Sequence, residues 1–163
     1  MITIRTVRRA AAIAAWAIVA SYSVAALADD VSGFATAAYA RGLGTPEMMH
    51  KIDTDGDGTV SRDEWIAYQE KVFAMLDKNH TGKVDAKAFM SGHSEMASFA
   101  TGGYASGLQT PEMMHKIDAD GDGTVSHDEF ITYQTRIFDI MDTGHKGMID
   151  KEQMLATGGA NRH

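Results

Sequence analysis

The sequence of 163 residues predicts an all-α protein built from two copies of a helix–loop–helix unit. Three observations predict this class. An acidic loop of 12 residues occurs twice, at residues 53–64 and 118–129. Each loop is followed by a segment in which apolar residues recur every three or four positions, which is the period of an amphipathic helix. The surrounding sequence also repeats at a constant offset of 65 residues, as expected for an internal duplication.

Both acidic loops present oxygen donors at positions 1, 3, 5, 7, 9 and 12. Calcium is a hard cation that takes roughly six to eight oxygen ligands, so a chain must wrap around it with alternate residues pointing inward. Gly58 and Gly123 at position 6 permit the sharp turn, because glycine adopts a positive φ without steric cost. We predict that the loops bind two Ca²⁺ ions through Asp53, Asp55, Asp57, the carbonyl of Thr59, Ser61 and Glu64, and through Asp118, Asp120, Asp122, the carbonyl of Thr124, Ser126 and Glu129.

Residues 1–28 have the features of a secretory signal peptide. Three arginines precede an apolar run that is shorter than the about 20 residues that a membrane span needs. The small residues that end at Ala28 form a cleavage site. We therefore expect a periplasmic or secreted protein, cleaved after Ala28, with no membrane span in the mature chain. An uncleaved membrane anchor is the alternative.

The mature chain is predicted to form two units, residues 29–95 and residues 96–163. In each unit a Thr-Pro-Glu sequence marks the start of a short helix that leads into the complete loop, because threonine caps a helix and proline suits its first turn. The first of these helices is expected to span Pro46 to Ile52. Residues 29–44 are interpreted as a weak helix or an irregular segment, and residues 157–163 as a disordered tail.

Each unit also contains an incomplete loop, at residues 77–88 and 142–153. The first of them has Ala88 at position 12 in place of a bidentate carboxylate, so we expect weak binding at best. In the second, Lys146 puts a positive charge where an ion would lie and Gln153 stands at position 12, so we expect no ion. Both keep a glycine at position 6 and an apolar residue at position 8, which indicates that they are structural partners of the complete loops.

One helix connects the two loops of each unit, since only twelve residues separate Glu64 from Asp77. A helix of about thirteen residues is roughly 20 Å long, which places these two loops at opposite ends. Unless this helix breaks, the loops can pair only across the duplication, for example complete with complete and incomplete with incomplete.

The complete loops and their flanking apolar helices resemble the EF-hand superfamily, which includes calmodulin. The resemblance covers most of residues 45–155 and implies a calcium-binding helical fold. Calmodulin-type pairs have two helices between their loops, whereas this chain has one. The resulting short spacing resembles that of exported bacterial EF-hand proteins, among them the lanmodulin family of periplasmic lanthanide binders. Thr54 and Ala119 stand where lanmodulin has proline, and Ser61 and Ser126 where it has more acidic ligands. Calcium is therefore favoured, and lanthanide binding is the alternative.

Composition argues against several other functions. The leader holds three of the 15 basic residues and none of the 22 acidic ones, which leaves 12 basic against 22 acidic residues. An acidic chain without a basic patch is not expected to bind nucleic acid or anionic membranes. The absence of cysteine excludes disulfides and cysteine-based zinc sites. No nucleophile motif or phosphate loop is present, and we predict that the protein is not an enzyme.

Methionine is abundant in the short helices that precede the complete loops, where Met48-Met49-His50 recurs as Met113-Met114-His115. Thioethers and imidazole suit Cu(I), but these methionines are better explained as the apolar face of the helix. His50 and His115 are expected to face solvent. A Met-rich apolar surface is also a means of binding a protein partner. A calcium sensor, a calcium buffer and a calcium-stabilised adhesion or interaction module all remain open.

Overall fold

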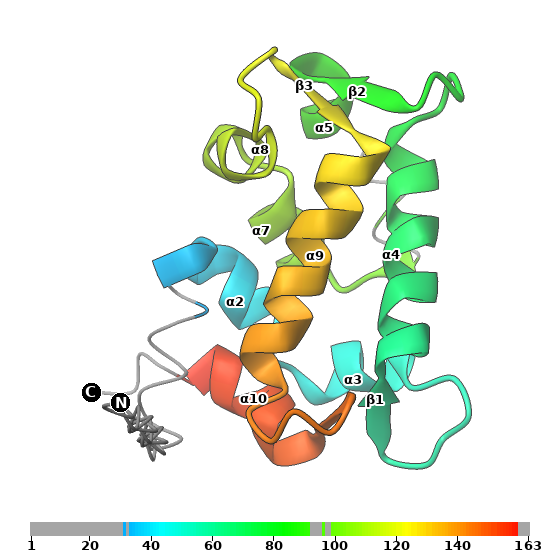
Figure 1. Cartoon of the computed structure of the whole chain (residues 1–163), viewed down its shortest axis with the longest axis vertical. Coiled ribbons are helices and arrows are strands. Elements are labelled where there is room, and N and C mark those ends of the chain that lie inside the picture. Colours follow the sequence, from blue (N-terminus) through cyan, green and yellow to red (C-terminus); the bar gives the residue numbers. More distant parts are fainter. Residues whose placement is uncertain (1–30, 32, 92–95, 97–98, 160–163) are drawn as a thin grey trace, which may run out of the picture.

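The computed structural model describes residues 31, 33–91, 96 and 99–159 (Figure 1). The expected signal peptide, residues 1–28, lies outside the described residues. In the part of the chain that is described, no helix combines the length and the apolar character that crossing a membrane requires.

The predicted all-α fold is confirmed, because helices dominate and each strand has only three residues. The second half repeats the order of elements found in the first. The first half contains α2 (Ala37–Leu43), α3 (Pro46–Ile52), β1 (Thr59–Ser61), α4 (Arg62–Leu76), β2 (Lys83–Asp85) and α5 (Ala86–Ser91). The second half contains α7 (Gly102–Leu108), α8 (Pro111–Ile117), β3 (Thr124–Ser126), α9 (His127–Met141), β4 (Met148–Asp150) and α10 (Lys151–Gly159).

Local sequence signals explain where the helices begin. The hydroxyl of Thr45 accepts a hydrogen bond from the backbone N–H of Met48 at 3.1 Å, and Pro46 opens α3 as predicted. The segment interpreted as a weak helix or an irregular one contains α2, whose N-cap is Thr36. Each of these caps is repeated 65 residues later.

The long helices α4 and α9 lie side by side and antiparallel, and this arrangement decides which loops pair (Figure 1). The start of α4 lies beside the end of α9, so β1 pairs with β4, and at the other end β2 pairs with β3. Pairing across the duplication, as the shared helix predicts, is confirmed. The expected pairing of one complete loop with the other was wrong. Each complete loop pairs with an incomplete loop instead.

The N-terminal segment of each half packs against the long helix of the other half. The hydroxyl of Tyr39 in α2 donates to Oε1 of Gln134 in α9 at 2.7 Å. In the mirrored contact, the hydroxyl of Tyr104 in α7 donates to Oε1 of Gln69 in α4 at 2.9 Å. All four side chains are fully buried, and the two tyrosine rings lie 5.3 Å apart. The two halves therefore share one core.

The methionines of α3 and α8 belong to this core, as predicted for the apolar face of these helices. Met48 and Met113 are 0 % exposed. The backbone N–H of Thr36 donates to the Sδ of Met113 at 3.4 Å, and that of Thr101 donates to the Sδ of Met48 at 3.5 Å. Each sulfur thus contacts the start of a helix of the opposite half.

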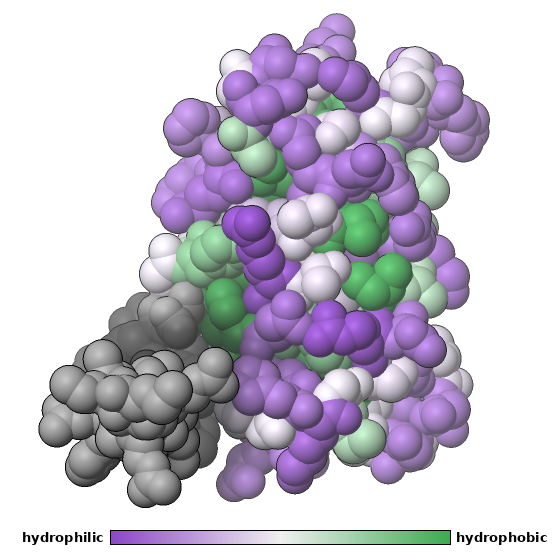
Figure 2. Space-filling view, viewed as in Figure 1, coloured by the Kyte–Doolittle hydropathy of each residue, from purple (hydrophilic) through white to green (hydrophobic). Residues whose placement is uncertain are grey.

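The face of the molecule seen in Figure 2 is mostly hydrophilic. Figure 2 shows one face, on which apolar side chains gather only in small separate patches between polar ones. Among the described residues, Met148 is the exposed large apolar side chain, at 43 %.

The C-terminal segment is more ordered than the sequence predicts. A disordered tail was expected from residue 157, but residues 157–159 belong to α10, so the expectation was wrong for these three residues. Thr157 is buried, since α10 packs against α2, with Gly158 against Gly44. The sequence signal was weak because these residues are small and polar, and only the packing partner makes them part of the core. Residues 160–163 lie outside the described residues.

The two halves also approach each other closely where α2 crosses α7. A Cβ added to Gly42 would lie 2.3 Å from the carbonyl carbon of Gly103, and one added to Gly107 would lie 2.5 Å from the Cα of Tyr39. Both obstacles are backbone atoms, which a side-chain rotation cannot remove. Glycine is therefore required at both positions of this crossing.

We predict that Gly107→Ala lowers the free energy of unfolding by about 1–3 kcal/mol, because the added methyl group forces α2 and α7 apart. Gly42→Ala should have a similar effect. Urea unfolding followed by circular dichroism measures it. Gly102→Ala, in the same helix but with open space around its Cβ, is the control and should not be destabilising. Equal stabilities of Gly107→Ala and Gly102→Ala would contradict the packing described here.

Candidate metal sites

The two acidic loops lie at opposite ends of the α4–α9 pair, each beside an incomplete loop. We refer to residues 53–64, 77–88, 118–129 and 142–153 as the first, second, third and fourth loops. The first pairs with the fourth, and the third pairs with the second. Val60 opposes Ile149 and Val84 opposes Val125, so the apolar residue at position 8 of each loop is the centre of its contact.

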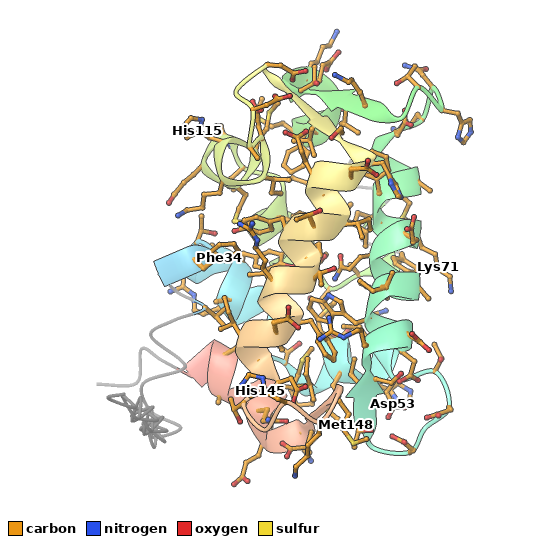
Figure 3. The ribbon with its side chains drawn as sticks, viewed as in Figure 1. Phe34, Asp53, Lys71, His115, His145 and Met148 are labelled. Carbon is orange, nitrogen blue, oxygen red and sulfur yellow. The ribbon has the colours of Figure 1, made fainter. Side chains whose placement is uncertain are left out.

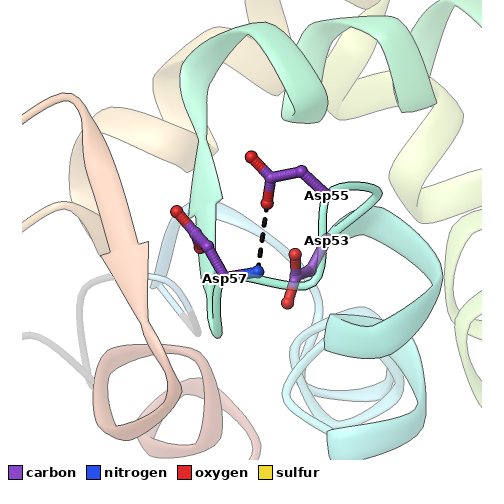
Figure 4. A group of neighbouring side chains, drawn as sticks. All are labelled: Asp53, Asp55 and Asp57. Atoms are coloured by element: carbon purple, nitrogen blue, oxygen red, sulfur yellow. Dashed lines mark hydrogen bonds between the residues drawn. The ribbon is translucent and has the colours of Figure 1, made fainter.

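In the first loop three predicted ligands gather around one point. Asp53, Asp55 and Asp57 each offer a carboxylate oxygen within 4.8 Å of the others (Figure 4). Hydrogen bonds from the loop backbone hold them, for example from Gly56 N–H to Asp53 Oδ1 at 2.8 Å. Gly56 and Gly58 have φ values of 74° and 86°, which turns the chain around this point. Three like charges so close to one another create a strong preference for a cation.

The fourth predicted carboxylate ligand of the first loop, Glu64, closes the loop from the first turn of α4. Its Oε1 accepts from the N–H of Thr54 at 2.8 Å, and its Oε2 accepts from the N–H of Ser61 at 2.9 Å. Ser61 and Glu64 form a capping box. Burial alone would raise the pKa of Glu64, but the hydrogen bonds from Ser61, Thr54 and Asp55 outweigh it and lower the pKa to about 2. Glu64 is thus an anion already positioned over the loop.

The third loop has the same backbone but a different grouping of carboxylates. Asp118, Asp120 and Glu129 are the ones whose oxygens lie within 4.8 Å of one another. Asp122 is instead paired with Lys83 of the second loop, whose Nζ donates to Asp122 Oδ2 at 2.8 Å. That ammonium group is the main reason why the pKa of Asp122 is lowered to about 2.

The remaining predicted ligands lie in the strands. Thr59 and Thr124 begin β1 and β3, opposite Asp150 and Asp85. The hydroxyls of the serines at position 9 donate to the glutamates at position 12, from Ser61 Oγ to Glu64 Oε2 at 2.8 Å and from Ser126 Oγ to Glu129 Oε2 at 2.7 Å. These serines and glutamates were predicted as ligands, but their second role as a capping box was missed, although the Ser-x-x-Glu pattern signals it.

The incomplete loops keep the shape of the complete ones. Asp77 and Asp142 at position 1 accept hydrogen bonds from the N–H groups of Gly82 and Gly147, each at 2.7 Å. Position 4 has positive φ in all four loops, and in the incomplete loops it is occupied by histidines, with φ of 53° at His80 and 49° at His145.

In the fourth loop an amide takes the place of the closing carboxylate. Gln153 Oε1 accepts from the N–H of Asp150 at 2.8 Å, while its Nε2 donates to Thr143 Oγ1 at 2.8 Å. Internal hydrogen bonds thus close this loop, which makes it a rigid partner for the first loop.

The chemistry of the complete loops fits a hard divalent cation. Each cluster brings three carboxylates together, and carboxylate oxygens are the ligands that such a cation prefers. The methionines of α3 and α8 are buried, and His50 and His115 are exposed as predicted. Figure 3 shows His115 on the outside of α8.

Comparison with known proteins places this geometry in a family. The family model of an EF-hand domain pair matches residues 67–135, and that of a single EF hand matches residues 47–67. The first of these contains the second and third loops, which pair in the structure. The chain is an EF-hand domain protein. Its two acidic loop clusters make it a calcium-binding member of that family.

Three curated proteins are similar to this chain. The calcineurin B subunit of Naegleria gruberi is 33 % identical over 95 residues, which are 53 % of this chain and 51 % of that protein. Probable GTP diphosphokinase CRSH, chloroplastic, of Arabidopsis thaliana is 29 % identical over 89 residues, 52 % of this chain and 14 % of the relative. Transaldolase of Thermosynechococcus vestitus is 50 % identical over 38 residues, which are 23 % of this chain and 10 % of the relative.

The chain spans about half the length of the calcineurin relative and a much smaller share of the two enzymes. The matches to the enzymes cover only EF-hand regions of this chain. What is shared with them is therefore the calcium-binding segment.

An ion pair beside the third loop provides a test of this geometry by pH. His127 Nε2 lies 2.7 Å from Glu70 Oε2, which raises the pKa of the imidazole above its ordinary 6.5. Because the folded pKa is the higher one, this stabilisation is complete below the unfolded pKa and is lost as the pH rises through the folded pKa. We predict that His127→Gln lowers stability by less than about 1 kcal/mol at pH 5 and leaves it unchanged at pH 9.

The other half offers the matched control. Arg62 occupies the position of His127, pairs with Asp139 and lies over the ring of Phe138 at 4.7 Å. Arginine stays charged throughout this range, so Arg62→Gln should lose the same stability at pH 5 and pH 9. Urea unfolding at both pH values measures the difference. A pH-independent loss in His127→Gln would show that the ion pair has no such role.

Proposed function

We propose that the protein binds two calcium ions, one in the first loop and one in the third loop, and acts as a calcium sensor. The observation that carries the proposal is the gathering of three carboxylates within 4.8 Å in each complete loop. The loop backbone already holds these groups in place, so an ion replaces hydrogen bonds and relieves repulsion.

In the first loop the proposed ligands are the side chains of Asp53, Asp55, Asp57, Ser61 and Glu64 with the carbonyl of Thr59. In the third loop they are Asp118, Asp120, Asp122, Ser126 and Glu129 with the carbonyl of Thr124. A bound ion supplies a divalent charge that crosslinks the two helices flanking the loop. With four carboxylate ligands in each proposed site, we expect dissociation constants between roughly 10⁻⁶ and 10⁻³ M.

The position of the methionines favours a sensor over a buffer. Helix α3 ends at Ile52, directly before the first proposed ligand Asp53, while Glu64 lies in the first turn of α4. An ion that draws these two groups together changes the angle between the helices. Movement of α3 would detach Met48 from the N–H of Thr101, and a thioether is a weak acceptor that gives up this contact readily. The apolar faces of α3 and α8 then become available to a partner.

A helical segment of another protein is the partner that such a surface fits. The relative from Naegleria is itself named as a subunit, which supports an assembly role for this fold. We propose that the protein is not an enzyme and that it acts in the periplasm or outside the cell. The basic and apolar residues of the predicted signal peptide support that location.

We predict that Glu64→Gln and Glu129→Gln each abolish one of two calcium sites, because the closing carboxylate is lost. Calorimetric titration of residues 29–163 with Ca²⁺ measures the number of sites. Glu47→Gln and Glu112→Gln remove a carboxylate from the first turns of α3 and α8, outside the loops. These two controls should keep both sites. Two sites surviving in the Glu64→Gln, Glu129→Gln double variant would refute the ligand assignment.

We also predict that saturation with Ca²⁺ increases the fluorescence of a dye that binds exposed apolar surface. The reason is that the buried methionines of α3 and α8 become accessible. Calcium binding without a change in dye fluorescence would identify a buffer or a calcium-stabilised module instead. Titration with La³⁺ tests the alternative of a lanthanide binder, which requires a preference for La³⁺ well beyond that due to its extra charge.

A further inference from the structure

The two complete loops differ in what their partner loop brings to them. Lys83 lies in β2, directly opposite Ser126 of the third loop. Its Nζ donates to Asp122 Oδ2 at 2.8 Å, while Asp122 Oδ1 accepts from the N–H and the hydroxyl of Thr124 at 2.8 and 2.6 Å. Both oxygens of this predicted ligand are therefore occupied by donors from the protein.

The equivalent position in the other half carries no charge. Sixty-five residues after Lys83 stands Met148, which lies opposite Ser61 of the first loop and is 43 % exposed. Figure 3 shows Met148 at the same end of the molecule as Asp53. Among the described residues no lysine, arginine or histidine pairs with Asp57, the counterpart of Asp122.

The grouping of carboxylates differs in the same way. In the first loop Asp57 gathers with Asp53 and Asp55. In the third loop Glu129 gathers with Asp118 and Asp120, while the counterpart of Asp57 is the aspartate held by Lys83. Both clusters have three members, and the lysine coincides with the absence of Asp122 from the cluster of the third loop.

We propose that Lys83 is an internal competitor for the cation of the third loop, so that the first loop binds calcium more tightly and fills first. This inference rests on the proposed calcium sites. The ammonium group offsets the negative charge of the third loop before the ion arrives. An ion that coordinates Asp122 must either displace Lys83 or bind with a like charge close by.

The charges involved set the size of the effect. Lys83 is in an exposed ion pair, with 56 % of its side chain accessible, so water and salt screen it. Exposed pairs contribute modestly, and we expect Lys83→Met to tighten calcium binding at the third loop by about two- to fivefold. Since Coulomb energy scales with the charge of the ion, the logarithm of this gain should be about 1.5 times larger for La³⁺ than for Ca²⁺.

The internal duplication supplies a reciprocal experiment. In the Glu64→Gln background only the third loop is left, and Lys83→Met should tighten its binding of Ca²⁺. In the Glu129→Gln background only the first loop is left, and Met148→Lys should weaken its binding by a similar factor. Each loop is compared with itself, so the differences between Thr54 and Ala119 and between Arg62 and His127 cancel.

A charge-matched control separates the local effect from the change in net charge. Lys71 lies on the exposed side of α4 and points away from the loops (Figure 3). Lys71→Met in the Glu64→Gln background should leave the affinity of the third loop unchanged. Circular dichroism and urea unfolding check that each variant is folded. Calorimetry at 0.05 and 0.5 M salt adds a second readout, because the gain from Lys83→Met should shrink as salt screens the lysine.

Each outcome has one reading. Tighter binding in Lys83→Met with weaker binding in Met148→Lys supports the proposal. Weaker binding in Lys83→Met would overturn it and assign Lys83 to holding Asp122 in place for the ion. An unchanged affinity, or an equal gain in Lys71→Met, would overturn it too. If the parent protein and both single-loop backgrounds bind no calcium at all, the proposed function itself has failed.

Discussion

The antiparallel contact of α4 with α9 is the constraint on which the rest of the structure depends. Each of these helices connects two loops and is too long for those loops to meet, so every loop takes its partner from the other half. The same arrangement brings the N-terminal helix of one half against the long helix of the other, through Tyr39 with Gln134 and Tyr104 with Gln69. The pairing of the loops and the shared core are thus consequences of one helix pair.

Patterns within the sequence predicted the parts of the structure that depend on neighbouring residues. The acidic loops, the caps such as Thr45 and the apolar face of the short helices were predictable because their periods and spacings are local. Contacts between distant residues were not. The pairing of the first loop with the fourth follows from the direction of two helices, and the ion pair of Lys83 with Asp122 follows from that pairing. The order of residues 157–159 likewise depends on a partner in α2.

The incomplete loops show how a binding motif serves as scaffold. They have lost the closing carboxylate but keep the left-handed turn at position 4, the glycine at position 6 and the first aspartate that holds the loop backbone. Their strands fix the strands of the complete loops. A complete loop is therefore paired with a neighbour whose own hydrogen bonds hold its backbone, which reduces the ordering that binding must accomplish.

Covalent fusion of the two halves has a consequence for symmetry. Two separate copies of one unit, associated about a twofold axis with the contacts of Gly42 and Gly107, would carry the same residue at both ends of the assembly. Joined in one chain, the copies are free to diverge. A lysine is found beside one acidic cluster and a methionine beside the other. Through this one difference, a fused pair can have two sites of unequal affinity and so respond to one ion over a wider range of concentration. In a symmetric dimer the two ends are identical before any ion binds.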